Sequence, residues 1–156
     1  PPPPPPPAEV DAFFDSFEVS EWNGLWTEDS QNDWFRSEQR ATDGDHSAEV
    51  DGSSSNASLT SIPIDLQGKT NATITFSWLI ERRLDSGEYL AFVVSTDGGA
   101  TWTEKAKLSG NVDAENVWHN ASVDLTGISA LKLQFRGKMS QSDEDANVDA
   151  VRVVAK

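Results

Sequence analysis

The stretch from Gly87 to Trp102, Gly-Glu-Tyr-Leu-Ala-Phe-Val-Val-Ser-Thr-Asp-Gly-Gly-Ala-Thr-Trp, decides the fold class. Its first half alternates between two apolar sides, with Leu90, Phe92 and Val94 on one and Tyr89, Ala91 and Val93 on the other. A strand that is apolar on both faces must be covered on both faces, so we expect it inside a sheet that packs against another layer. The glycines and the aspartate that follow predict a hairpin turn, where the chain reverses.

The turn itself, Ser95-Thr-Asp-Gly-Gly-Ala-Thr-Trp102, resembles the Asp box of sialidase propeller blades, Ser-x-Asp-x-Gly-x-Thr-Trp. A propeller repeats its blades every ~40 to 50 residues, and this sequence holds a single copy of the motif. We therefore interpret it as a structural turn, in which Asp97 and Thr101 bond within the hairpin and Trp102 packs beneath it.

Other segments also alternate at the strand period, and no segment shows helical spacing. The expected strands are 10–18, 46–50, 59–66, 72–80, 118–125, 131–136 and 148–154. Residues 19–45 lack a period and predict irregular strands and loops held by aromatic side chains. Pro63 predicts that strand 59–66 lies at a sheet edge or contains a bulge. The alternation in strand 72–80 predicts that one of its faces is exposed. The sequence predicts an all-β fold, a two-sheet antiparallel jelly-roll β-sandwich.

The chain has 156 residues and begins with seven prolines. We assign residues 1–8 to a polyproline linker and residues 9–156 to one sandwich domain. The prolines predict a stiff spacer, or alternatively a ligand for an aromatic-lined groove. No apolar run approaches the ~20 residues that span a bilayer, so we expect no membrane insertion.

Acidic residues dominate the charge, with 26 Asp and Glu against 12 Lys and Arg, a net charge of −14. They concentrate in residues 8–60, where 13 acids face two arginines. Such a field repels nucleic acid and attracts cations, which makes a divalent metal the expected partner. The alternative is a solvated acidic surface that keeps the protein soluble. The sequence contains no cysteine, which excludes disulfides and thiolate metal sites.

Several short motifs recur in the order found in a known family. They are Phe17-Glu18, Asp33-Trp34, Asp45-His-Ser47, Leu59-Thr-Ser-Ile-Pro63, Phe76-Ser-Trp78, Gly87 before a long strand, Trp118 and Asn147-Val-Asp149-Ala-Val-Arg-Val153. Their order resembles the MAM family of extracellular modules, in a form without its usual cysteines. The opening Phe-Glu and closing Val-Asp-x-Val are also similar to jelly-roll carbohydrate-binding modules. The resemblance implies a jelly roll with a structural calcium between its first and last strands and no catalytic activity.

The predicted calcium ligands are four carboxylates. Glu18 and Asp149 match the family's Phe-Glu and Val-Asp positions, and Asp43 and Asp45 form a tight acidic turn around Gly44. Carboxylates and carbonyls are the oxygen ligands that Ca²⁺ takes in proteins. The alternative is that Asp43 and Asp45 only cap a turn. A second acidic segment, residues 140–147, is expected to be a solvated loop, with another cation site as the alternative.

Sugar binding would need exposed aromatic rings beside planar polar groups, and Trp22, Trp26 and Tyr89 are the candidates. The alternative is that these rings belong to the core. Sequons at Asn56, Asn71 and Asn120 predict glycosylation if the source is eukaryotic.

Catalysis has no motif to support it. His46 and His119 lack metal-ligand spacing, and the sequence has no nucleophile elbow or phosphate-binding loop. We therefore expect a non-catalytic, extracellular or cell-surface module, stabilised by calcium, that binds a glycan or a protein. The alternative is a structural glycoprotein repeat of a surface filament, self-associating through polyproline segments and sandwich contacts.

Overall fold

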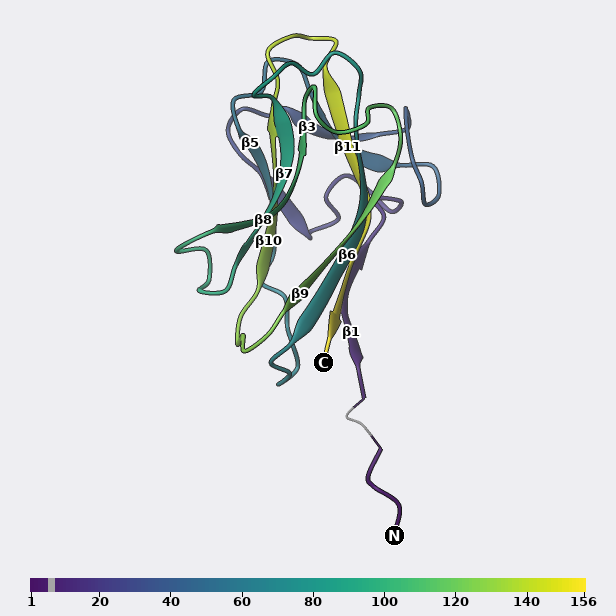
Figure 1. Cartoon of the computed structure of the whole chain (residues 1–156), viewed down its shortest axis with the longest axis vertical. Coiled ribbons are helices and arrows are strands. Elements are labelled where there is room, and N and C mark those ends of the chain that lie inside the picture. Colours follow the sequence, from purple (N-terminus) through teal and green to yellow (C-terminus); the bar gives the residue numbers. More distant parts are fainter. Residues whose placement is uncertain (6–7) are drawn as a thin grey trace.

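Eleven strands build two antiparallel sheets in the computed structural model, which describes residues 1–5 and 8–156 (Figure 1). The strands are β1 (Val10–Asp15), β2 (Trp26–Glu28), β3 (Trp34–Ser37), β4 (Ser47–Asp51), β5 (Ala57–Ser61), β6 (Ala72–Ile80), β7 (Tyr89–Ser95), β8 (Thr103–Ser109), β9 (His119–Leu125), β10 (Lys132–Lys138) and β11 (Asp145–Ala155). The predicted all-β sandwich is confirmed. The polyproline linker predicted at residues 1–8 includes residues 6 and 7, which lie outside the described part.

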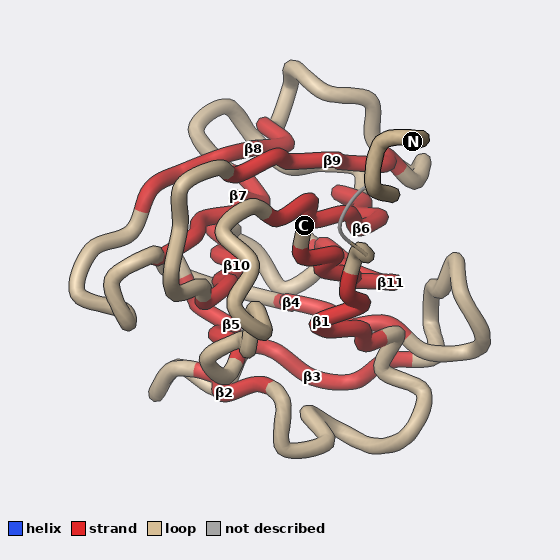
Figure 2. Tube along the Cα trace, turned by 90° about the horizontal axis from the view of Figure 1, so that it is seen from below, coloured by secondary structure: helices blue, strands red, loops and turns tan. Residues whose placement is uncertain are grey.

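The two sheets face each other across one core (Figure 2). The five-stranded sheet has the order β2-β5-β10-β7-β8, and the six-stranded sheet has the order β3-β4-β11-β6-β9, with β1 also paired to β11. One edge of β11 is shared by two partners: residues 145–148 pair with β4 and residues 151–155 pair with β1. Asp149 lies where β11 passes from one partner to the other.

β7 is the strand predicted to be apolar on both faces. It lies between β10 and β8, inside the sheet, as expected. Phe92 points into the core, where its ring centroid lies 4.6 Å from that of Phe76 and 5.1 Å from that of Phe135. Ala91 and Val93 are buried on the outer side of the same strand. Burial on both faces is therefore confirmed for the central part of β7.

The hairpin turn between β7 and β8 is also confirmed. The Asp97 carboxylate accepts hydrogen bonds from the Ser95 hydroxyl at 2.7 Å, the Thr101 amide at 2.9 Å and the Thr101 hydroxyl at 2.5 Å. The hydrogen bonds from Thr101, followed by the one from Ser95, lower the pKa of Asp97 to about 2. The Asp box thus acts as a structural turn, and Trp102 is half-buried behind it.

Two strand predictions need correction. The strand expected at 59–66 ends at Ser61, before Pro63, and β5 is an inner strand between β2 and β10 rather than an edge. The half-exposed prediction holds only for the first half of β6, where Thr73 and Thr75 are partly exposed; Ser77 and Leu79, further along the outer side, are buried. Two loops approach the outer side of β6 at that end: the Asn116 amide bonds the Ile80 carbonyl at 2.8 Å, and the side chains of Arg40 and Asn116 meet at 3.3 Å.

Candidate functional site

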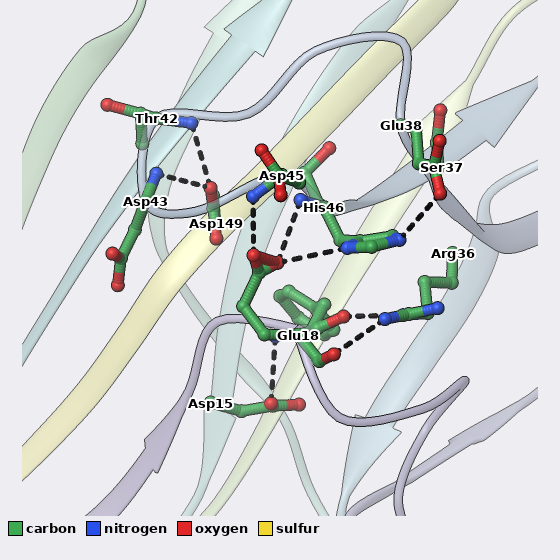
Figure 3. A network of polar contacts seen from close by, with 12 residues as sticks. Asp15, Glu18, Arg36, Ser37, Glu38, Thr42, Asp43, Asp45, His46 and Asp149 are labelled. Atoms are coloured by element: carbon green, nitrogen blue, oxygen red, sulfur yellow. Dashed lines mark hydrogen bonds and ion pairs between the residues drawn. The ribbon is translucent and has the colours of Figure 1, made fainter.

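Two acidic side chains hold one loop of the six-stranded sheet, residues 42–46, from two sides (Figure 3). Asp149 Oδ2 accepts hydrogen bonds from the backbone N–H groups of Thr42 and Asp43, both at 2.9 Å. Glu18 accepts from the N–H of Asp45 through Oε1 and from the N–H of His46 at 2.8 Å through Oε2. We call Glu18, Asp149 and residues 42–46 the loop clamp.

Glu18 is placed by the turn that follows β1. The Asp15 carboxylate accepts the Phe17 N–H at 2.9 Å and the Trp26 indole N–H at 2.8 Å, which fixes this turn against the core. Phe17 has a φ of 63° and is almost fully buried. The Arg36 guanidinium, reaching from β3, donates to the carbonyls of Phe17 and Glu18, each at 2.6 Å. Glu18 therefore leaves a backbone that is tied to the core and to β3.

Asp149 is placed by a bulge in β11. The register with β6 shifts between Asp149 and Arg152, and Ala150 adopts a φ of 51°, a left-handed conformation uncommon for alanine. The Ala150 N–H turns back onto Asp149 Oδ1 at 2.7 Å. Asn147 and Asp149 alternate with the core residues Ala146 and Val148, so both face the outer side of the sheet.

The two clamp carboxylates differ in their pKa. Burial raises the pKa of Asp149 to about 6, although the N–H groups of Asp43, Thr42 and Ala150 act to lower it. Burial also acts to raise the pKa of Glu18, but the N–H groups of Asp45 and His46 prevail and lower it below its ordinary value. The His46 ring contributes from 3.3 Å and is itself bonded to Glu38 at 3.0 Å.

Gly44 is required at the centre of the loop for two reasons. Its φ is +71°, which glycine adopts without strain, and a Cβ at this position would lie 1.8 Å from Glu18 Oε1. The close approach of Gly44 lets the Glu18 carboxylate reach the amides of the next two residues. The glycine in the Asp-Gly-Asp turn is thus part of the clamp.

The four predicted calcium ligands meet at one loop but not at one point. Asp43 and Asp45 are exposed, and every oxygen of Glu18 and Asp149 already accepts an N–H. Carboxylates and carbonyls are the oxygen donors that calcium prefers, but an ion here would have to share or displace the N–H groups that these carboxylates already accept. Glu18 and Asp149 would hold the ion, and Asp43 and Asp45 would add charge beside it.

An open groove of about 590 Å³ lies beside the loop clamp on the outer face of the six-stranded sheet. Thr42 and Asp43 form one wall, and the strands β1, β6, β9 and β11 contribute the rest, including Phe14, Thr75, Ser77, Asn120, Ser122 and Arg152. The Phe14 ring is 41% exposed, with the Arg152 guanidinium 4.4 Å from its centroid. The groove therefore combines hydroxyl, amide and guanidinium groups with one exposed aromatic ring.

The three aromatic residues predicted to bind sugar lie elsewhere. Trp26 belongs to the core, with its ring centroid 5.6 Å from Phe13 and 6.0 Å from Phe135, so it offers no face to a ligand. Trp22 is half-buried against Phe17. Tyr89 lies half-buried on the outer side of the five-stranded sheet, which is the other face of the sandwich.

Tyr89 is also engaged by two neighbours. Its hydroxyl donates to Asn56 Oδ1 at 2.6 Å, and the Lys107 ammonium lies 4.8 Å from its ring centroid. One face of the ring is therefore covered by a cation. Stacking of a sugar on Trp22 or Tyr89 stays a prediction.

The sequons lie at three separate places. Asn56 is exposed beside Tyr89, and Asn71 is half-buried with its Oδ1 accepting the Gly127 N–H at 3.2 Å. Asn120 lines the groove, and its Oδ1 accepts the Ser77 hydroxyl at 2.8 Å. A glycan on Asn120 would fill the groove, so glycosylation there and ligand binding exclude each other.

The second acidic segment is only in part the solvated loop that the sequence predicts. Residues 140–147 were expected to be a solvated loop, but β11 begins at Asp145, and Glu144, Asp145 and Asn147 are buried. The carboxylates of Glu49, Asp51 and Asp145 come within 4.8 Å of one another, and so do those of Asp85, Glu88 and Glu144. The weak alternation of polar and apolar residues from Asp145 to Asp149 was the available signal for a strand.

Among the described residues, no helix is long and apolar enough to cross a membrane. The comparison with protein-family models found no match, and neither did the comparison with curated protein sequences. Similarity to known proteins is found in the fold of solved structures.

Solved structures of two kinds share the fold at low sequence identity. The K3 cleaved adhesin domain of Lys-gingipain from Porphyromonas gingivalis W83 matches with a TM-score of 0.73 and 15% identity, over 96% of this chain and 100% of that domain. The CBM22-1 xylan-binding domain of Paenibacillus barcinonensis Xyn10C matches with a TM-score of 0.67 and 15% identity, over 96% and 97%. TmCBM61, solved with β-1,4-galactotriose, matches with a TM-score of 0.67 and 13% identity, over 90% and 94%.

These matches support the carbohydrate-binding side of the resemblance and give the MAM side no specific support. At such identities a match establishes architecture and leaves ligand and partner open. The chain has the β-sandwich fold of carbohydrate-binding modules and of bacterial adhesin domains.

Proposed function

We propose that this domain is a non-catalytic, extracellular or cell-surface module that binds a glycan in the groove beside the loop clamp. The observation that carries the proposal is the composition of the groove. The Asn120 amide, the hydroxyls of Thr75 and Ser122, and the exposed Phe14 ring, one face of which is covered by Arg152, line one open surface. Sugars are bound in this way, by an apolar platform for the ring and planar polar groups for its hydroxyls.

The groove is better suited to this role than the Tyr89 face. Asn120 uses its Oδ1 to accept the Ser77 hydroxyl, an arrangement that leaves its Nδ2 as a donor for a ligand. The groove also opens along β6 and β9, whose outer residues Thr75 and Ser122 are direct cross-strand partners. A linear oligosaccharide fits an open groove of this kind more readily than a closed cavity.

Calcium at the loop clamp is the second part of the proposal. A bound ion would fix Thr42 and Asp43, which form one wall of the groove, and so would couple folding of the loop to ligand binding. Because such a site exists only in the folded chain, calcium at a hundredfold excess over its Kd would stabilise the domain by roughly 2.7 kcal/mol. Magnesium would stabilise it less, because its strict octahedral geometry suits a flexible oxygen site poorly.

The test of glycan binding is isothermal titration with xylo-oligosaccharides and with β-1,4-galactotriose, the two ligand classes represented among the structural matches. Asn120→Ala and Arg152→Ala should each weaken binding at least tenfold, whereas Tyr89→Ala, on the other sheet, should leave it unchanged. Loss of binding in Tyr89→Ala with full binding in Asn120→Ala would move the site to the five-stranded sheet. If neither sugar binds, a glycan array must supply a ligand, and an empty array refutes the glycan assignment.

The calcium part has its own test. The melting temperature in calcium should exceed that in chelator, and Asp149→Ala should lose a large part of that shift. Asp143→Ala is the matched control, because Asp143 is an exposed acid whose partner is Arg83 at 2.9 Å. If calcium raises the melting temperature of the Asp149→Ala and Asp143→Ala variants equally, the proposal that calcium binds at the loop clamp is wrong.

A further inference from the structure

We infer that the six-stranded sheet carries a second divalent-cation site, separate from the loop clamp, formed by Glu49, Asp51, Asp145 and Asn147. These four residues, which we call the acidic row, lie on adjacent strands. Asp51 of β4 is directly opposite Asp145 of β11, and Glu49 is directly opposite Asn147. Their side chains share the outer face of the sheet, since Val50, Ala146 and Val148 between them point into the core.

The carboxylates are close enough for one ion to reach all three. One oxygen from each of Glu49, Asp51 and Asp145 lies within 4.8 Å of the others. Calcium binds oxygen at 2.3–2.6 Å, so ligands of one ion lie at most about 5 Å apart. Like charges directly opposite each other on neighbouring strands destabilise a sheet, and a cation held between them would offset this repulsion.

The buried oxygens without hydrogen-bond partners supply independent evidence. Among the described residues four buried side-chain atoms lack a partner, and three of them are Asp51 Oδ1, Asp145 Oδ1 and Asn147 Oδ1. Asn147 is fully buried, and its Nδ2 lies 3.4 Å from Glu49 Oε1, which places the amide inside the acidic row. Leaving a buried oxygen unpaired destabilises the fold, and a cation held by the carboxylates would pair the free oxygens of Asp51 and Asp145.

Among the described residues, no basic side chain forms an ion pair with the acidic row. Glu81 lies beside it, with its N–H on the Asp145 carbonyl at 2.9 Å, and Arg40 is committed to Glu81 at 2.5 Å. Donors to the row are neutral: the Ser37 hydroxyl bonds Glu49 at 2.8 Å. A set of three carboxylates is of the type that calcium selects.

The test uses the whole chain, stripped with chelator and then titrated with calcium chloride by calorimetry, together with melting curves. Asp145→Asn keeps the shape of the side chain and removes one charge. With calcium this variant should lose one equivalent of bound ion and part of the calcium shift. Glu49→Gln should behave in the same way, and Asp143→Asn, in the exposed loop, should match the parent protein.

The outcomes separate this site from the clamp. If both sites bind, the parent protein takes two ions, and Asp145→Asn and Asp149→Asn each take one. If only the acidic row binds, Asp145→Asn takes none. If Asp145→Asn and Glu49→Gln keep the parent stoichiometry and calcium shift, the acidic row is a buried acid pair that shares a proton, and the inference is wrong. Glycan titration in the same variants reports on the proposed function separately.

Discussion

The loop clamp and the acidic row both place carboxylates on the outer face of the six-stranded sheet. They differ in whether the carboxylate oxygens have hydrogen-bond donors. In the clamp each oxygen of Glu18 and Asp149 accepts a backbone N–H. In the row Asp51 and Asp145 face each other and leave oxygens without a partner. Acidic charge alone therefore does not identify a cation site. The donors already present around each carboxylate decide how much an ion can add.

The largest expected effect comes from removing the acceptor in the clamp. Asp149→Ala would leave the N–H groups of Thr42, Asp43 and Ala150 without their partner, and we expect a loss of about 3 kcal/mol in the free energy of unfolding. Urea unfolding in chelator measures it without a contribution from calcium. A loss below about 1 kcal/mol would mean that water replaces the carboxylate and that the clamp is not tight.

Gly44→Ala should follow, with a loss of about 2 kcal/mol, because the new Cβ meets Glu18 Oε1 in addition to the strain of a left-handed alanine. Gly24→Ala is the matched control: its φ is +70°, close to the +71° of Gly44, but its Cβ would have nothing within 4 Å. The difference between the two variants isolates the contact with Glu18. Equal losses would show that Glu18 moves aside freely.

A smaller effect of opposite sign is expected in the acidic row. Asp51→Asn removes one of two facing carboxylates. Burial raises the pKa of Asp145 to about 8, so without calcium and above that pH the substitution should raise the free energy of unfolding by about 1 kcal/mol. Combining it with Asp145→Asn should add little, because the first substitution already relieves the repulsion. A double-mutant cycle in chelator measures this coupling, and simple additivity would contradict the pairing described above.

The smallest effect concerns Asp97, whose carboxylate, like the clamp, is held by hydrogen-bond donors within its own turn. Its folded pKa of about 2 lies below the ordinary value of 3.8, so its contribution is complete above pH 4 and is lost as the pH falls toward 2. Asp97→Asn should therefore melt below the parent protein at pH 6, and the gap should narrow on acidification. A gap that stays constant from pH 6 to pH 2 would show that charge plays no part in the turn.

The parts of the fold that were predictable from sequence are those fixed by local pattern. Strand 72–80 was predicted with its observed bounds, and the hairpin after Ser95 was identified from its glycines and Asp97. Glu18 and Asp149 were singled out by resemblance, and the structure brings them to the predicted loop. What they do there is to accept N–H groups, which no spacing of residues reveals.

The acidic row was not predictable, because it depends on which strands become neighbours. Glu49 and Asn147 are 98 residues apart, and their pairing follows from the order of strands in the sheet. Burial of Asp145 also depends on loops that cross the outer face, where a strand usually meets water. Residues 142–145, Ser-Asp-Glu-Asp, have the composition of a solvated loop. Glu144 and Asp145 become buried only when the sheet is assembled.

The pairing of β1 with the end of β11 has a mechanical consequence. Val10 pairs with Ala155, so the domain starts and ends at the same end of one antiparallel pair (Figure 1). A force that pulls Val10 and Ala155 apart would break the hydrogen bonds between β1 and β11 one at a time, in unzipping geometry. It would not load all of them at once, as a shear force does. β11 is also held by β6 along its other side, so β1 would peel away first. Detachment of β1 would transfer the force to the turn that carries Glu18. The loop clamp would therefore be the next part of the domain to be disrupted.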